Sequence, residues 1–153
     1  MKNNKIKVII FDWGRTLNDP ISDKLFEGSL HVVKKLSKLY KLVLVSLAVR
    51  ESSELRKEKI VASGIAPYFQ LILVGGEDKD KMYDKVLTDL SVEPNSVAII
   101  DDRVVRGIAW GNRRGAMTIW IKKGKFENEL PNEITGVPNF TLKDIREVES
   151  LLS

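Results

Sequence analysis

Residues 7–17 read KVIIFDWGRTL, an apolar run that ends in a carboxylate, Asp12, followed closely by a glycine and a hydroxyl. The run from Lys7 to Phe11 is nearly continuous rather than alternating in hydropathy, which is typical of a strand covered on both faces of a parallel sheet. The polar residues follow at the carboxyl end of this strand, where open parallel sheets bind their ligands. This stretch therefore predicts a buried first strand that brings Asp12 to a binding site.

Four more runs with the same strand character follow along the chain. They are Lys41 to Ser46, Gln70 to Val74, Val97 to Ile100 and Met117 to Ile121. Between them, apolar residues recur at helical steps of three and four, as in Phe26 to Leu36 and Met82 to Leu90. Alternation of strands and helices favours right-handed crossovers between parallel strands. We predict an α/β fold, a three-layer Rossmann-like domain whose parallel sheet of about five strands has helices on both faces.

The C-terminal end of the sequence predicts one more helix. Thr141 and Asp144 have the spacing of a capping box, which marks a helix start. The apolar residues that would share one face of this helix are Leu142, Ile145, Val148 and Leu151. Residues 122–139, which precede it, show no periodicity, and we expect them to form the one long irregular connection.

The composition is that of one globular domain. The chain has 153 residues, 43% of them hydrophobic and 30% charged, and we expect residues 1–153 to form a single domain. The longest apolar segment, Leu42 to Val49, is strand-sized, and the N-terminal apolar run is too short for a signal peptide. We therefore expect a cytoplasmic location and no membrane partner. The formal net charge of +4 suits anionic ligands without singling out nucleic acid.

The cysteine and histidine content restricts which side chains can serve as catalytic groups or metal ligands. The chain has no cysteine, which excludes disulfides, thiolate nucleophiles and cysteine-ligated metal centres. His31 is the single histidine, so a site with several histidine ligands is excluded, and its place within a predicted helix favours a structural role. Any catalysis must therefore use carboxylates, hydroxyls, lysine and arginine.

Chemically useful side chains stand at the carboxyl ends of the predicted strands. They are Asp12 after the first strand, Ser46 at the end of the second, Lys79 and Lys81 after the third, and Asp101 with Asp102 after the fourth. Taken singly, each is also consistent with a turn, a helix cap or a solvated surface. Because the carboxyl ends of parallel strands meet at one edge of the sheet, we expect the set to converge there.

The ordered set resembles the motifs of the haloacid dehalogenase (HAD) superfamily. Members carry a strand that ends in an Asp nucleophile, with Thr-Leu four and five residues later. The other motifs are a Ser or Thr ending the next strand, a Lys opening a later helix, and an acidic residue or pair ending another strand. The matching residues here are Asp12, Thr16 and Leu17, then Ser46, then Lys79 with Lys81 as the alternative, then Asp101 and Asp102. The resemblance covers nearly the whole chain and implies a HAD-like core domain. Residues 18–45 and 47–78, at the usual cap positions, leave no room for a sizeable cap domain.

The resemblance implies a phosphatase that requires Mg²⁺ and forms an aspartyl-phosphate on Asp12. A carboxylate can attack phosphorus and so divide hydrolysis into two easier steps. Mg²⁺ held by hard oxygen ligands would screen the repulsion between this carboxylate and the phosphate. The implied metal ligands are Asp12, the Gly14 carbonyl and Asp102, the implied phosphate ligands are Ser46 and Lys79, and the accessory candidates are Arg15, Thr16 and Asp101.

Two positions depart from the family pattern. Gly14 stands where family phosphatases usually have a second Asp, which protonates the leaving group and then activates water. Loss of such a group costs about 10² to 10⁴ in rate, so acyl phosphates and activated aryl phosphates become the favoured substrates. Gly107 stands where a further acidic residue often follows Asp102. A second interpretation therefore stays open, in which the chain is a degenerate, non-catalytic domain that binds a phosphorylated ligand or a protein.

Without a cap domain the predicted site is open to solvent, which affects what can bind in it and what can cover it. An open site admits a phosphorylated small molecule or a phosphorylated macromolecule. Its cover would be a second copy of the chain, in a homo-oligomer, or the segment 122–139. Nucleic acid is the less favoured partner, because the basic cluster of Lys122, Lys123 and Lys125 has no regular interleaving with aromatic residues.

Overall fold

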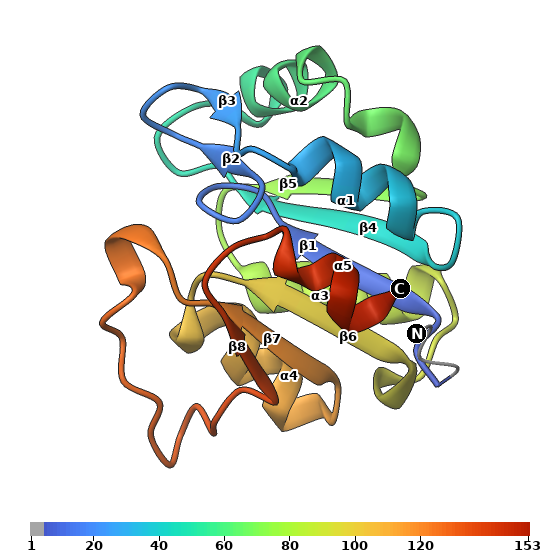
Figure 1. Ribbon diagram of the computed structural model, residues 1–153, viewed down its shortest axis with the longest axis vertical. Coiled ribbons are helices and arrows are strands. Elements are labelled where there is room, and N and C mark those ends of the chain that lie inside the picture. Colours follow the sequence, from blue (N-terminus) through green and yellow to red (C-terminus); the bar gives the residue numbers. More distant parts are fainter. Residues whose placement is uncertain (1–4) are drawn as a thin grey trace.

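The computed structural model describes residues 5–153 and has a parallel sheet at its centre (Figure 1). Its six strands lie in the order β5-β4-β1-β6-β7-β8, and every neighbouring pair is parallel. The strands are β1 (Val8–Asp12), β4 (Lys41–Leu47), β5 (Leu71–Gly75), β6 (Val97–Asp101), β7 (Met117–Ile121) and β8 (Phe140–Leu142). The α/β class and the parallel sheet are thus confirmed, with one strand more than the five expected.

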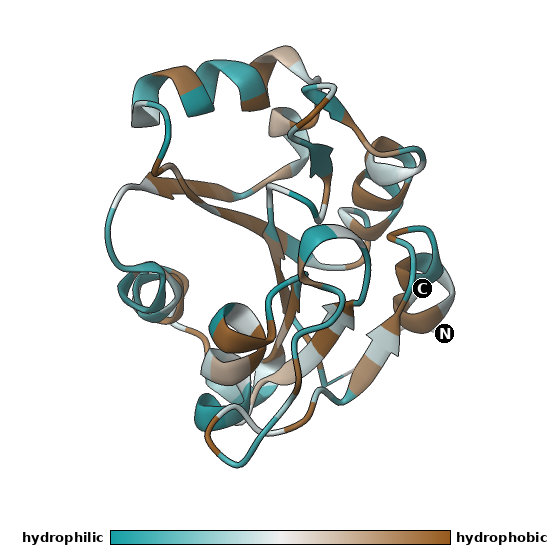
Figure 2. Cartoon of the chain, turned by 90° about the vertical axis from the view of Figure 1, so that its left-hand side faces the viewer, coloured by the Kyte–Doolittle hydropathy of each residue, from teal (hydrophilic) through white to brown (hydrophobic). Residues whose placement is uncertain are grey.

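Helices cover both faces of this sheet. They are α1 (Ser29–Leu36), α2 (Ser53–Ala62), α3 (Lys79–Asp89), α4 (Ala109–Arg114) and α5 (Glu147–Leu152), with the short turns η1 (Ala66–Tyr68), η2 (Pro94–Ser96), η3 (Val104–Ile108, π-helical) and η4 (Gly124–Phe126). One buried core joins the sheet to α1, α2 and α5, and another joins it to α3 and α4 (Figure 1). Alternate residues of β1 serve the two cores, with Ile9 and Phe11 in the first and Val8 and Ile10 in the second. This explains the continuous apolar run, and Figure 2 shows the strands as mostly brown ribbons inside a largely teal periphery.

The C-terminal helix begins later than the sequence predicts. Thr141 lies in β8 and pairs with β7, whereas α5 begins at Glu147. The prediction of a helix start at Thr141 is wrong because the edge of β7 offers unpaired backbone groups, which an extended segment satisfies. Asp144 forms a local turn instead, in which its carboxylate accepts the Arg146 N–H at 2.9 Å. The expected apolar face is partly kept, since Ile145 is buried.

The segments at the usual cap positions are short. Between β1 and α1 the chain forms only a hairpin of β2 (Asn18–Asp19) and β3 (Lys24–Leu25), and between β4 and β5 only α2 and η1. No large cap domain is therefore evident in the described part of the chain, as expected. His31 lies on α1 and contacts Glu149 of α5 at 3.0 Å, in agreement with a structural role. None of the helices within residues 5–153 has the length and apolar character needed to cross a membrane.

Candidate active site

Buried polar residues gather at the carboxyl edge of the sheet, around β1, β4 and β6. Asp12 ends β1, Ser46 lies near the end of β4, Asp101 ends β6 with Asp102 directly after it, and Lys79 opens α3. All five residues are buried. The parallel pairing of β1 with β4 on one side and β6 on the other brings these strand ends together. They lie at or beneath an open pocket of about 530 Å³.

Asp12 is held by a cation and a hydroxyl. Lys79 Nζ lies 2.5 Å from Asp12 Oδ1, and Thr16 donates its hydroxyl to Oδ2 at 3.1 Å. Burial raises the pKa of Asp12 above its usual value, and the Lys79 ammonium opposes this shift. The Asp78 side chain caps α3 by accepting the Lys81 N–H, which starts the helix at Lys79. Lys81 is exposed and does not line the pocket, so the fold brings only Lys79 to Asp12.

Asp101 is a fixed carboxylate beneath the pocket. Its Oδ2 accepts the Gly107 N–H at 2.8 Å and lies 3.4 Å from the Tyr83 hydroxyl, and its Oδ1 accepts the Arg103 N–H at 3.2 Å. Lys79 Nζ is 3.7 Å from the same Oδ2. Burial alone would lower the pKa of Lys79, but the two neighbouring carboxylates outweigh it and hold this pKa well above its usual value. The charged ammonium therefore bridges two carboxylates.

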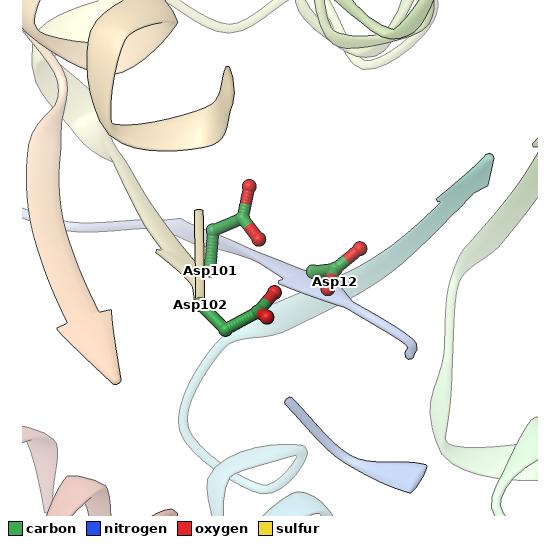
Figure 3. Close-up of side chains that lie close together, drawn as sticks. All are labelled: Asp12, Asp101 and Asp102. Atoms are coloured by element: carbon green, nitrogen blue, oxygen red, sulfur yellow. The ribbon is translucent and has the colours of Figure 1, made fainter. Parts of the chain in front are cut away.

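Asp102 has the least satisfied carboxylate of the site. Its Oδ2 is buried without a hydrogen-bond partner, whereas its backbone carbonyl accepts the Trp120 indole N–H at 2.9 Å. Figure 3 shows the side chains of Asp12, Asp101 and Asp102 close together, and one oxygen of each lies within 4.8 Å of the others. Burial, together with the negative charges of Asp12 and Asp101, raises the pKa of Asp102 to about 10.

This set of oxygen donors fits a hard divalent cation. Mg²⁺ prefers oxygen ligands and is commonly held by one or two carboxylates. A cation here would give the orphaned Asp102 oxygen a partner and neutralise the repulsion between Asp12 and Asp102. Asp101 is the weaker ligand candidate, because backbone N–H groups already bond both of its oxygens. The residues that fit are therefore Asp12 and Asp102, and Gly14 lines the same pocket.

Ser46 lies on the β4 side of the pocket next to Arg56, an arginine that no sequence motif indicates. Its hydroxyl oxygen accepts a hydrogen bond from Arg56 Nη1 at 2.6 Å, and Glu51 accepts one from Nε of the same side chain at 2.7 Å. The hydroxyl proton of Ser46 can then be donated to a ligand. Arg56 carries no motif signal in the sequence, because only the crossover from β4 through α2 folds it back onto Ser46.

The turn after β1 leaves room where the family has its second Asp. A Cβ atom at Gly14 would meet no atom within 4 Å. Arg15, the next residue, lines the pocket as well. Two further carboxylates line the pocket, Asp23 and Glu51, but both are engaged by Lys59. Apart from Asp102, a candidate metal ligand, the described pocket residues include no unpaired carboxylate that could replace the acid missing at Gly14.

Comparisons with known proteins agree with this architecture. Residues 75–148 match the family model described as HAD-hydrolase-like. The haloacid dehalogenase-like protein SP0104 from Streptococcus pneumoniae covers 99% of this chain and 100% of its own at 12% identity, with a TM-score of 0.79. The magnesium-bound putative HAD-hydrolase YfnB from Bacillus subtilis covers 86% of this chain and 57% of its own at 20% identity, with a TM-score of 0.70. These structures establish the fold.

Curated relatives point to phosphatases. Glyceraldehyde 3-phosphate phosphatase from Methanopyrus kandleri is 27% identical over 96 residues, which cover 60% of this chain and 41% of the relative. Other curated relatives that match are also phosphatases by name, and the chain spans less than half the length of these relatives. The parallel sheet with a buried lysine and carboxylates at its carboxyl edge defines an α/β protein with a candidate site for an anionic ligand. The chain thus resembles the HAD-like hydrolases, since residues 75–148 match their family model and solved structures of this type share its fold.

Proposed function

We propose that this chain is a Mg²⁺-dependent phosphohydrolase that forms an aspartyl-phosphate on Asp12. The observation that carries the proposal is the pairing of Asp12 with Lys79 at the floor of an open pocket, beside the orphaned oxygen of Asp102. The phosphatase relatives support the general activity, and the magnesium-bound structural neighbour supports the cofactor. The substrate in this proposal is a phosphorylated small molecule or macromolecule that reaches the open pocket.

In the proposed mechanism, Lys79 and Ser46 bind the outer oxygens of the phosphoryl group while Thr16 orients Asp12. An Asp12 oxygen attacks phosphorus, the new O–P bond forms as the bond to the leaving oxygen breaks, and the electron pair departs with the leaving group. Water then attacks phosphorus and gives its proton to solvent, the bond to Asp12 breaks, and inorganic phosphate is released. Asp12, Asp102 and the Gly14 carbonyl would hold Mg²⁺, and the bound ion would supply positive charge that lessens the repulsion between the attacking carboxylate and the phosphate.

The open space beside Gly14 limits the substrates that suit this site. With glycine at position 14, no side chain there can protonate a leaving oxygen, so alkyl phosphate esters are expected to react about 10² to 10⁴ times more slowly than they would with an acid at this position. The leaving groups of acyl phosphates and activated aryl phosphates depart as stable anions without a proton, so the rates for these substrates fall less. The same absence slows the attack of water, so the phosphorylated form of Asp12 is expected to accumulate.

Hydrolysis of an aryl phosphate and an acyl phosphate, with and without Mg²⁺, tests the proposal. We expect metal-dependent turnover that begins with a burst, because the second step is slower than the first. Asp12→Asn is expected to show no turnover and no burst, and mass spectrometry of acid-quenched wild type is expected to find a phosphoryl group on Asp12. Asp89→Asn, which removes an exposed carboxylate of α3, is the matched control and keeps activity. Turnover that persists in Asp12→Asn would refute the nucleophile.

One observation favours a second function. The missing acid at Gly14 is also what a domain that binds a phosphorylated ligand without hydrolysing it would show. Calorimetric titration with inorganic phosphate and Mg²⁺ separates the two functions. The binding function would replace the catalytic one if the chain binds inorganic phosphate, turns over neither the aryl nor the acyl phosphate, and forms no phosphorylated Asp12.

A further inference from the structure

Three cationic side chains surround one aromatic ring at the pocket. Phe126 belongs to η4, in the long connection between β7 and β8. The centre of its ring lies 3.7 Å from Arg103 Cζ, 5.4 Å from Lys125 Nζ and 5.6 Å from Arg15 Cζ. All four residues line the pocket that contains Asp12. They come from three segments far apart in the sequence, so the fold gathers this charge.

The positive charge around Phe126 is only partly neutralised. Arg103 pairs with Glu129 at 3.2 Å. Within residues 5–153, no carboxylate forms an ion pair with Arg15 or Lys125, and Arg106, which lines the same pocket, has none either. Like charges held close together repel one another, so an anion bound among them would lower the free energy of the folded chain.

The backbone at Arg15 gives an independent reason to assign its side chain a role. Its φ is +64°, in the left-handed region that residues with a side chain rarely adopt. The turn is held by a hydrogen bond from the Arg15 N–H to the Asn18 carbonyl at 2.8 Å. A glycine would adopt this conformation without a strain of about 1 kcal/mol. The turn itself therefore does not require an arginine, and the guanidinium is the group that distinguishes this residue.

The opposite side of the pocket offers less free charge. Arg56 and Lys59 both bond Glu51, and their hydrogen bonds are 2.7 Å long. Arg50 is exposed, and it is the one pocket cation on that side without an ion pair in the described part of the chain. A negatively charged group that enters the pocket therefore finds most of its free partners beside Phe126.

We propose that the substrate carries a second anionic group besides its phosphoryl group, and that Arg15 and Lys125 bind this group beside Phe126. Arg106 contributes a third cation. Guanidinium groups form two-point hydrogen bonds with carboxylates and phosphates, and ammonium groups bind either as point charges. The inference rests on the proposed function, because the phosphoryl site at Asp12 anchors the other end of the molecule. The substrate class is thus a phosphorylated carboxylic acid or a compound with two phosphoryl groups.

Binding of phosphonates, which are not hydrolysed, tests this inference without relying on turnover. Three series of alkylphosphonates of increasing chain length are titrated by calorimetry with Mg²⁺ present. Their far ends carry a carboxylate, a second phosphonate or an uncharged carboxamide. At the length that reaches from the floor of the pocket to Phe126, we expect the anionic ends to bind about tenfold more tightly than the carboxamide. The preference is expected to shrink as salt is added.

Charge-removing variants assign the effect to residues. Arg15→Gln and Lys125→Gln are each expected to reduce the preference for the anionic ends roughly threefold and to leave carboxamide binding within about twofold of wild type. Lys34→Gln removes the same charge from the exposed face of α1, outside the pocket, and leaves the preference unchanged. The far end, carboxylate or second phosphonate, whose series binds more tightly identifies the chemical class of the second anionic group.

Each failure has its own signature. If all three series bind equally well to wild type, the second anionic group is refuted while the phosphoryl site stands. If the preference exists but survives both Arg15→Gln and Lys125→Gln, its assignment to the Phe126 side is refuted. If no phosphonate binds at any length, the phosphoryl site of the proposed function fails, and the inference fails with it.

Discussion

At the scale of single residues, Asp102 connects the pH dependence of stability with the proposed binding of Mg²⁺. Its pKa of about 10, against a usual value of 3.8, means that the carboxyl group keeps its proton at neutral pH in the metal-free protein. The folded chain then binds more protons than the unfolded chain between these two values. The contribution of Asp102 to stability is therefore present at low pH and is lost as the pH rises through this window.

We predict that Asp102→Asn removes both this pH dependence and the response to Mg²⁺. The amide is always uncharged, so the melting temperature of the metal-free variant is expected to fall less from pH 5 to pH 9 than that of wild type. Mg²⁺ at about a hundred times its Kd is expected to stabilise wild type by about 2.7 kcal/mol and the variant far less. Calorimetric unfolding at several pH values, with EDTA or Mg²⁺, measures both effects. An equal Mg²⁺ response in the variant would contradict the role of Asp102.

Gly14 allows the missing acid to be restored. Its Cβ position is open and its φ does not lie in the left-handed region, so Gly14→Asp is expected to fold normally. A carboxyl group there can protonate the leaving oxygen, and we predict that kcat for an alkyl phosphate rises by about 10². Turnover of an acyl phosphate, whose leaving group needs no proton, is expected to gain less in its first step.

Gly14→Asn is the matched control for this gain. Asparagine has the size of aspartate but cannot donate a proton from a carboxyl group, so its alkyl phosphate turnover is expected to equal that of wild type. Initial rates on one alkyl and one acyl phosphate decide the comparison. A gain of the same size in Gly14→Asn would show that filling the space matters, rather than general acid catalysis.

At the scale of elements, the turn η3 and the end of β6 share one small space. A Cβ atom at Gly107 would lie 2.5 Å from Asp101 Oδ2 and 2.8 Å from Asp101 Cβ, distances at which one group must move. The glycine in η3 therefore lets the Asp101 carboxylate reach its N–H and Lys79. In this chain a carboxylate at Asp101 occupies the space that a side chain at residue 107 would need.

We predict that Gly107→Ala lowers the free energy of unfolding by about 1 to 3 kcal/mol, because it displaces a buried carboxylate from its hydrogen bonds. Gly76→Ala, whose Cβ would have its nearest contact at 3.5 Å, is the control and is expected to change stability by less than about 0.5 kcal/mol. Denaturant titration measures the free energy of unfolding of both variants.

Exchanging the two residues, Asp101→Gly with Gly107→Asp, is expected to recover part of the turnover that Asp101→Gly alone loses. No recovery would argue that Asp101 cannot be replaced from η3.

At the scale of the whole molecule, one sheet serves two cores. Trp13 belongs to the core on the α1 side, and Trp110 belongs to the core on the α3 side. Because β1 contributes alternate side chains to both, neither core can lose its packing while the other keeps an intact sheet. The described chain is therefore expected to unfold as one unit, in line with a single domain.

We predict one unfolding transition for both cores. Trp120 is replaced by Phe in both reporters. With Trp110→Phe added, the fluorescence of Trp13 follows the first core, and with Trp13→Phe added, the fluorescence of Trp110 follows the second. Each is expected to change at the same urea concentration as the far-ultraviolet circular dichroism of the same variant. Two separated midpoints within one variant would contradict a single cooperative domain.

Much of the fold could be predicted because its signals are local. Five strands were expected from continuous apolar runs, and all five are present, since burial on both faces needs such runs. The strand β8 and the hairpin of β2 and β3 were missed, because strands of two or three residues are too short to show a period. The segment around Thr141 became an edge strand because β7 lies beside it, a fact that no local pattern contains.

The residues alone specified the class of fold, the order of the motifs and the set of candidate groups from Asp12 to Asp102, because each depends on composition and spacing along the chain. Their convergence required the parallel register of β1, β4 and β6, and the catalytic roles assigned to them stay predictions. The arrangement of Arg15 and Arg103 around Phe126 likewise exists only in the folded chain. The physical reason is the same for the strand-end groups and for the cations around Phe126. Electrostatic contacts act over a few ångströms in space, whatever the separation of the residues along the sequence.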